Sequence, residues 1–158
     1  MREIIFRGKR ISNGEWVNGG IIKTFHPNFE HKSEIAFLEQ EPNCYAICAN
    51  NRDIFVEQET IGQFIGITVN DKKVFEGDII RIISTDYCGF NEIGKVEFKD
   101  GCFGISYIPE WEKEYGFKDL HFHRFGQVDK WQDHPASGEM RYTYEIIGNI
   151  HDNPELLE

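Results

Sequence analysis

The stretch "KKVFEGDIIRI" (residues 72–82) decides the fold prediction, because in it a charged turn leads directly into an apolar strand. Gly77 allows a backbone conformation that a side chain would penalise, and Asp78 can accept hydrogen bonds from nearby backbone amides. Residues 79–83 are too apolar for a strand with one solvent-exposed face. We therefore predict a turn that leads into a buried strand of a small barrel.

The segments on either side also predict strands. Residues 61–69 mix apolar residues with Gly62 and Gly66, a pattern that suits a bent strand better than a helix. Downstream, residues 94–107 alternate between apolar and polar positions around Asp100-Gly101, which predicts a hairpin with a two-residue turn. Short strands separated by turn signals are typical of all-β proteins.

The two ends of the chain also show strand and turn patterns. Residues 2–11 alternate well, and Asn13-Gly14 predicts a first hairpin with a type I′ turn. Near the other end, "HFHRF" (residues 121–125) and "RYTYEIIGNI" (residues 141–150) read as strands, whereas residues 110–120 could form a short helix. Asn153 before Pro154 predicts a terminal helical turn.

These patterns give a mainly β fold with two small β-rich subdomains. A chain of 158 residues, 40% of them hydrophobic, can bury a core in one domain or two small ones. We place the division after residue 55, which gives an N-terminal subdomain (1–55) and a C-terminal subdomain (56–158). The second is expected to be a small SH3-like barrel or a strongly bent sheet.

The composition predicts a cytoplasmic protein with reduced thiols. The chain has no apolar run near 18 residues, and its first residues lack the apolar core of a signal peptide, so neither a membrane span nor secretion is expected. The four cysteines are too few and too irregularly spaced for the disulfide framework of a small secreted domain.

The net charge of −10 argues against nucleic acid as the main partner, because phosphate neutralisation by Lys and Arg supplies most non-specific affinity. A local basic site could still exist at Arg7, Lys9 and Arg10. Solvated residues on an edge strand are the simpler interpretation of these three side chains.

Several motifs resemble, in order, the YopX-like proteins of phages and prophages in Gram-positive bacteria. They are "MREIIFRGKR", "ETIGQFIGI" with "VFEGDIIRI", "GKVEFKDGCFGI" and "YEIIGNIHDNPELLE". The resemblance runs from end to end and implies a mainly β protein in the cytoplasm of an infected or lysogenic bacterium. It implies no established activity, so it transfers no catalytic residue.

Candidate residues for chemistry are few. His121 and His123 are two apart, so on a strand both imidazoles would lie on one face and could share a metal, with His134, Asp133 or Asp119 as a third ligand. Two histidines without an evident third ligand do not make a tight site, so we predict no metal and no cofactor. The acidic run Glu110, Glu112 and Glu114 reads as a solvated face. Glu76 and Asp78 read as turn formers, and no catalytic residue is predicted.

Aromatic residues concentrate between residues 109 and 131. They can stack on bases, pack over a barrel end or form an oligomer contact. The surrounding acidic residues repel phosphate and so favour a protein contact. We predict self-association with anchors at Trp111, Phe117, Phe122 and Trp131.

The first functional hypothesis is a non-enzymatic phage or prophage accessory protein that binds a host or phage protein or assembles with itself. The alternative is a nucleic-acid-binding small β-barrel, which rests on analogy of fold. A second alternative is a metal- or carboxylate-dependent hydrolase.

Overall fold

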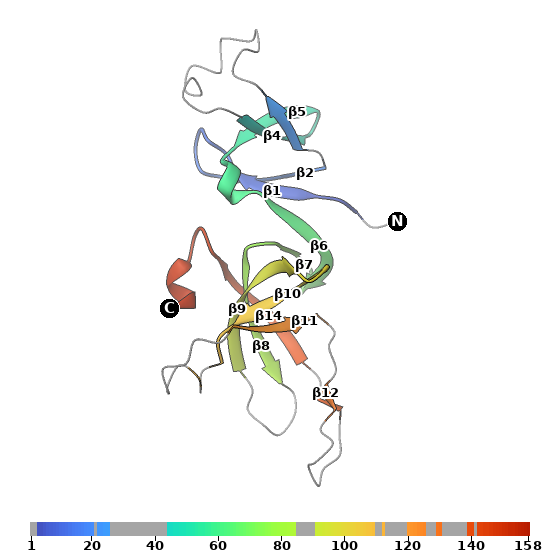
Figure 1. Cartoon of the computed structure of the whole chain (residues 1–158). Helices are drawn as coiled ribbons and strands as arrows, with labels where there is room; N and C mark the ends of the chain where they lie inside the picture. Colours follow the sequence, from blue (N-terminus) through green and yellow to red (C-terminus); the bar gives the residue numbers. More distant parts are fainter. Residues whose placement is uncertain are drawn as a thin grey trace. The chain divides into compact units, whose positions relative to one another are not determined.

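The computed structural model describes residues 3–20, 22–25, 44–84, 91–109, 112, 120–125, 129–130, 139–140 and 142–158. Strands account for most of these residues (Figure 1), so the prediction of a mainly β fold is confirmed. The predicted helix over residues 110–120 lies outside the described residues except for Glu112 and Leu120.

The strands in chain order are β1 (Phe6–Lys9), β2 (Trp16–Gly19), β3 (Ile22–Phe25), β4 (Cys44–Ala49), β5 (Arg52–Val56), β6 (Gly62–Val69), β7 (Lys72–Phe75), β8 (Asp78–Ser84), β9 (Asn91–Lys99), β10 (Cys102–Tyr107), β11 (His121–Arg124), β12 (Asp129–Lys130), β13 (Glu139–Met140) and β14 (Tyr142–Asn149). Two short 3₁₀ helices, η1 (Gln58–Thr60) and η2 (Pro154–Leu157), complete the assignment.

The chain forms two compact units, Met1–Gly66 (unit 1) and Ile67–Glu158 (unit 2). The division falls within β6, whose first residues pair with β1 and whose last residues lead into β7. The sequence pattern placed the division after residue 55, at the end of β5. The two compact units divide within β6, which begins as a strand of unit 1, and the predicted subdomain boundary stays a prediction.

Unit 1 is held together by a small apolar core. Buried Val17, Ile47 and Val56 come from β2, β4 and β5, and they form one cluster with partly buried neighbours such as Phe6 and Tyr45. The β1–β2 hairpin thus packs against the β3–β4–β5 sheet. Backbone bonds reinforce this contact, since Arg10 bridges Val56.

The first hairpin is confirmed as β1–β2, but its predicted type I′ turn is wrong. Gly14 has a φ of 70°, whereas Asn13 is not among the residues with positive φ. The strands pair only as far as Lys9 and Trp16, so the connection is longer than two residues. Asn13 instead uses its side chain, which accepts a hydrogen bond from the Glu15 backbone amide at 3.1 Å.

Three other hairpins do use two-residue turns with positive φ at both positions. Asp100-Gly101 between β9 and β10 was predicted, and its φ angles are 51° and 80°. Asn70-Asp71 joins β6 to β7 in the same way, as does Asn50-Asn51 between β4 and β5. These are the φ signs of type I′ turns, which match the twist of paired strands.

Unit 2 is built on a five-stranded antiparallel sheet in the order β11-β10-β9-β8-β14. The sheet curls into a half-barrel (Figure 1), which confirms the expected bent sheet in the C-terminal part. Its core contains Ile79, Ile80, Ile82, Val96 and Ile105, each at most 1% exposed. The prediction that residues 79–83 form a buried strand is confirmed for β8, except that Arg81 is partly buried and Ile83 is 37% exposed.

The turn before β8 also forms as predicted. Gly77 has a φ of 83°, a region that costs an L-amino acid about 1–2 kcal/mol. Asp78 is 2% exposed, and its Oδ2 accepts a hydrogen bond from the Phe75 amide at 2.8 Å. Asn149, at the end of β14, donates from Nδ2 to the Gly77 carbonyl at 2.9 Å, which ties the two distant motifs together.

The terminal helical turn is confirmed as η2. Pro154 occupies its first turn and Asn153 the capping position, but the Asn153 side chain makes no capping hydrogen bond. Instead the Asn153 amide donates to the Asn149 carbonyl at 2.8 Å, so β14 continues directly into this turn.

Candidate functional site

The most polar part of the unit 2 interior lies on one face of the five-stranded sheet, here called the inner face. Strand register places Ile80, Ile82 and Ile105 on this face. The same register adds His121 and His123 from β11 and the tyrosines Tyr142 and Tyr144 from β14. The inner face therefore has apolar residues on its central strands and imidazole and phenol groups on its two edge strands.

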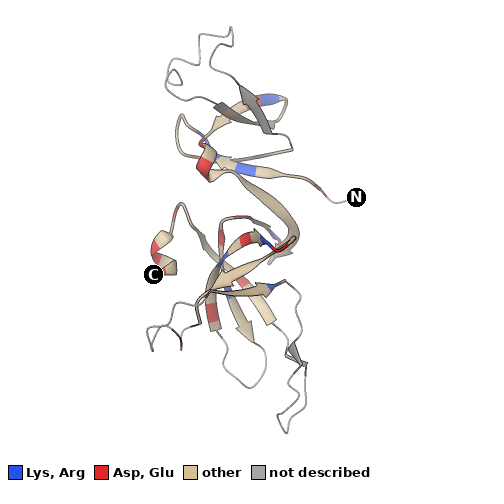
Figure 2. Ribbon diagram, in the orientation of Figure 1, with Lys and Arg blue, Asp and Glu red and all other residues tan. Residues whose placement is uncertain are grey.

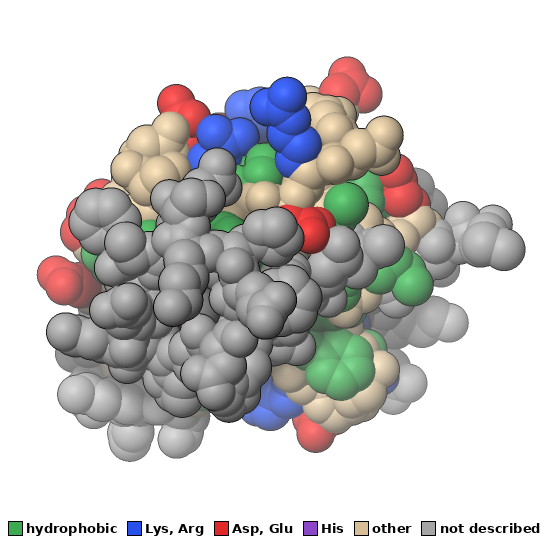
Figure 3. Space-filling model, turned by 90° about the horizontal axis from the view of Figure 1, so that it is seen from above, with side chains coloured by type: hydrophobic (Ala, Val, Ile, Leu, Met, Phe, Trp, Pro, Cys, Tyr) green, Lys and Arg blue, Asp and Glu red, His purple; other side chains and the backbone are tan. Residues whose placement is uncertain are grey.

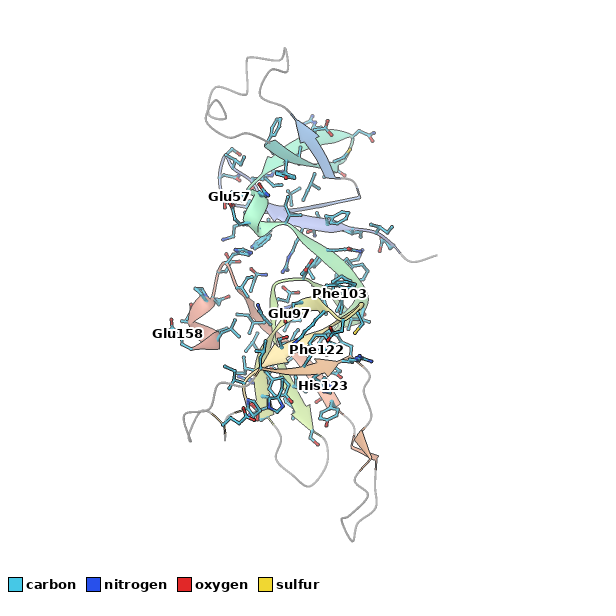
Figure 4. The ribbon with its side chains drawn as sticks, in the orientation of Figure 1. Glu57, Glu97, Phe103, Phe122, His123 and Glu158 are labelled. Carbon is cyan, nitrogen blue, oxygen red and sulfur yellow. The ribbon has the colours of Figure 1, made fainter. Side chains whose placement is uncertain are left out.

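His123 bridges the two edge strands of the sheet. It is 3% exposed, and its Nε2 lies 2.9 Å from the Tyr144 hydroxyl on β14. Its ring also meets Tyr142 edge to face, with centroids 4.5 Å apart. Because β11 and β14 are opposite edges of the sheet, these contacts close the half-barrel through side chains (Figure 4 labels His123).

His121 has a different partner. Its Nε2 lies 2.8 Å from Oε1 of Glu112, whose side chain is 7% exposed, whereas that of His121 is 42% exposed. The second carboxylate oxygen, Oε2, is buried and has no hydrogen-bond partner among the residues that the structure describes. The interpretation of Glu112 as part of a solvated acidic face is therefore wrong, because the carboxylate packs behind the imidazole.

The two predicted metal candidates thus share a face, as their spacing requires, but engage separate groups. His123 contacts tyrosines, and His121 contacts a carboxylate. Within the described residues no group of three His, Cys, Asp or Glu side chains could hold a metal ion. The proposed third ligands His134, Asp133 and Asp119 lie outside the described residues.

The opposite face of the sheet, the outer face, carries a charged network. The Ser106 hydroxyl donates to Oε1 of Glu97, and Lys95 Nζ lies 2.9 Å from Oε2 of Glu97. Burial raises the pKa of the Glu97 carboxyl, but the Ser106 hydrogen bond and the nearby lysines outweigh it and hold that pKa below its ordinary value. The network joins β9 to β10 across the outer face.

Of the predicted interface anchors, the structure describes only Phe122. Its ring packs over Gly104, where a β-carbon would collide with it, and Lys99 Nζ lies 5.8 Å from the ring centroid. Figure 4 shows Phe122 on β11, next to β10. Trp111, Phe117 and Trp131 lie outside the described residues.

The predicted basic residues lie in unit 1, and two of them share an aromatic partner. Arg7 Cζ lies 4.8 Å and Lys9 Nζ 5.5 Å from the Trp16 ring centroid, so both cations contact one indole. The Arg10 guanidinium lies 3.9 Å from the Glu15 carboxylate. Figure 2 marks basic and acidic positions along the ribbon, and Figure 3 shows Lys and Arg side chains gathered beside hydrophobic ones.

Sequence reasoning missed Glu112 and Tyr144 as partners of the two histidines. Tyr144 could have been found, because its alternation with Tyr142 in "YTY" puts two phenols on one strand face. Nothing in the sequence indicated that Glu112 would contact a histidine, because it is one of three alternating glutamates in an acidic run.

The fold and these contacts define a small all-β protein whose second unit is a curled half-barrel with a polar inner face. A family model described as "YopX protein" matches residues 5–158, so the chain belongs to this family. The family expected from the sequence motifs is confirmed. No curated protein and no solved structure matches the chain. No helix among the described residues is long and apolar enough to cross a membrane.

Proposed function

We propose that this protein is a non-enzymatic phage or prophage accessory protein, working in the bacterial cytoplasm, that acts by protein contact and first of all by self-association through unit 2. Membership of the YopX family supports the general setting. The observation that carries the proposal is the exposed Phe98, which packs on the partly buried Phe103 at the end of the β9–β10 hairpin.

Phe98 is 56% exposed, although it occupies the inner-face side of β9 with buried Val96. Its ring meets that of Phe103 edge to face, with centroids 5.0 Å apart. An exposed aromatic ring held in place by a second ring is the kind of anchor that dominates protein interfaces, because its burial removes a large apolar area from water.

The charges around this pair favour a second copy of the chain as the partner. Unit 2 as a whole has ten basic and eighteen acidic residues, which would repel another copy. In the sequence around Phe98, however, Lys95 and Lys99 balance Glu97 and Asp100, although strand register places Lys95, Glu97 and Lys99 on the outer face. The hairpin end is therefore locally neutral, and a two-fold axis there would bring aromatic rings together without uncompensated charge.

Phe122 lies on the opposite, outer face of the same sheet, where Lys99 contacts its ring. The other predicted anchors, Trp111, Phe117 and Trp131, belong to the same sequence region and remain part of the proposal. A host or phage protein that presents a matching apolar surface is the alternative partner.

Light scattering after gel filtration tests self-association. We expect a dimer of the 18.5 kDa chain, with Phe98→Ser shifting it to the monomer at micromolar concentration. Ile4→Ser is the matched control, because Ile4 is 58% exposed and lies in unit 1, outside the proposed contact. A monomer across a wide concentration range would refute self-association, and a dimer unaffected by Phe98→Ser would move the interface elsewhere.

Nucleic-acid binding is the second candidate, and the contacts of Arg7 and Lys9 with Trp16 favour it. Such a cation and indole arrangement can hold a phosphate beside a stacked base. The chain's own negative field opposes this, so we expect only weak binding. A gel shift in low salt is the measurement, and sub-micromolar affinity at physiological salt would reverse the ranking of the two functions.

A further inference from the structure

We propose that the seam between β11 and β14 is a latch that opens while the rest of unit 2 stays folded. The seam is the line along which these two edge strands of the sheet approach each other across the half-barrel. An open latch exposes the His123 imidazole and the inner face around it. The proposal concerns a movement within unit 2 and does not depend on the contact proposed for the β9–β10 hairpin.

The first argument is how the seam is held together. His123 Nε2 lies 2.9 Å from the Tyr144 hydroxyl, and the centroid of its ring lies 4.5 Å from that of Tyr142 and 5.8 Å from that of Tyr144. Phe125, which follows β11, also contacts Tyr144, with ring centroids 5.1 Å apart. All of these contacts are between side chains, and among the described strands no backbone ladder joins β11 to β14.

The second argument is the contrast between the seam and the strands behind it. β14 is paired with β8 along nearly all of its length, and β8 is paired with β9 from Ile79 to Ile83. A backbone ladder opens cooperatively, whereas side-chain contacts separate through rotamer changes and a small movement of a short edge strand. We therefore expect the seam to open at a lower free energy than these ladders.

The third argument is that β11 is anchored at the seam by a single residue. Of the four residues of β11 only His123 is buried, whereas His121 and Arg124 are exposed. Phe122 is partly buried, but it packs over Gly104 on the outer face, away from the seam. Movement of His123 out of the seam therefore leaves the packing of Phe122 and the pairing of β11 with β10 intact.

Labelling of the full-length chain with diethyl pyrocarbonate at neutral pH tests the latch, because this reagent acylates imidazole that solvent can reach. His121 is an internal reference, since its side chain is 42% exposed and His123 is 3% exposed. Tandem mass spectrometry distinguishes the two positions. We expect rapid labelling of His121 and slow labelling of His123, at a rate that low urea concentrations hardly change. An opening confined to the seam exposes little surface, whereas unfolding of unit 2 exposes much and depends steeply on urea.

The matched variants change one hydroxyl each. Tyr144→Phe removes the partner of His123 Nε2 and keeps the ring, so the labelling rate of His123 should rise about fivefold, the typical effect of one hydrogen bond, while that of His121 stays within about twofold. Tyr45→Phe makes the same change in unit 1 and should leave both rates within about twofold.

Three results would overturn the latch. They are a His123 that stays unlabelled in the folded wild-type chain, a His123 labelling rate that rises steeply with urea, and a rate unchanged in a folded Tyr144→Phe variant. The urea series needs only the wild-type chain, so it decides the question even where a variant fails to fold.

Discussion

Units 1 and 2 each have a small β core, but the two cores differ in how many polar residues they bury. In unit 1 the buried cluster is apolar, built around Val17, Ile47 and Val56, and Thr60 is its one buried polar residue among those described. Unit 2 also has an apolar core, but its described part buries Asp78, Ser84, Glu92, Ser106, Glu112, His123 and Asn149. Buried polar groups must find partners, and in unit 2 several of these partners fix turns and strand edges.

The differences in charge and in buried polar groups indicate which unit carries most of the candidate functional residues. Unit 1 is nearly balanced in charge, with seven basic and nine acidic residues, and unit 2 is strongly acidic. Buried polar groups cost stability unless they are paired, and they concentrate at sites with a specific role. The polar inner face and the Glu112–His121 pair both lie in unit 2, whereas unit 1 contributes the Arg7, Lys9 and Trp16 contact.

The largest effect is expected from matched cavities in the two cores. Ile47→Ala in unit 1 and Ile82→Ala in unit 2 each remove a fully buried side chain and should destabilise their own unit by about 2–5 kcal/mol. Hydrogen exchange measured by mass spectrometry follows each unit separately. Loss of protection confined to the mutated unit would show that the units unfold independently, and equal loss in both would show that they unfold as one.

A smaller loss is expected when the turn that anchors β8 is broken. Asp78→Ala removes the acceptor for the Phe75 amide and a contact with Asn149, so the free energy of unfolding of unit 2 should fall by about 1–3 kcal/mol. Asp78→Asn keeps an acceptor and should cost less. Chemical denaturation gives both values, and equal losses in the two variants would contradict the role assigned to the hydrogen bond.

The smallest effect concerns pH and the outer face of unit 2. The pKa of Glu97 is lower in the folded chain than its ordinary value of 4.5, so the ionised carboxylate stabilises the fold above that pH. This stability is lost as the pH falls below 4.5 and through the folded pKa. Glu97→Gln should therefore cost less than about 1 kcal/mol at neutral pH and progressively less in acid. Denaturation midpoints between about pH 7 and pH 3 measure the difference, and a gap that widened in acid would contradict the stated direction.

The sequence predicted most of the strand framework because its signals are local. Asp100-Gly101 predicts a type I′ turn because both residues tolerate a positive φ. The run after Gly77 predicts a buried strand because it is too apolar for a strand with one solvent-exposed face. Asn13-Gly14 carries a similar signal but forms a longer connection, because the pairing of β1 and β2 stops at Lys9 and Trp16. At this hairpin the point at which strand pairing ends, and not the Asn-Gly dipeptide, determined the length of the connection.

What the sequence by itself determined is the β framework, the buried strand after the Glu-Gly-Asp turn, the terminal helical turn and the family. Only the tertiary structure decided which distant residues meet. His121 and His123 share a strand face as alternation requires, but curling of the sheet carries His123 to Tyr144, and the chain after β10 brings Glu112 to His121. Periodicity reports which face a side chain occupies, whereas the partner across that face depends on sheet curvature and on long connections that no local pattern encodes.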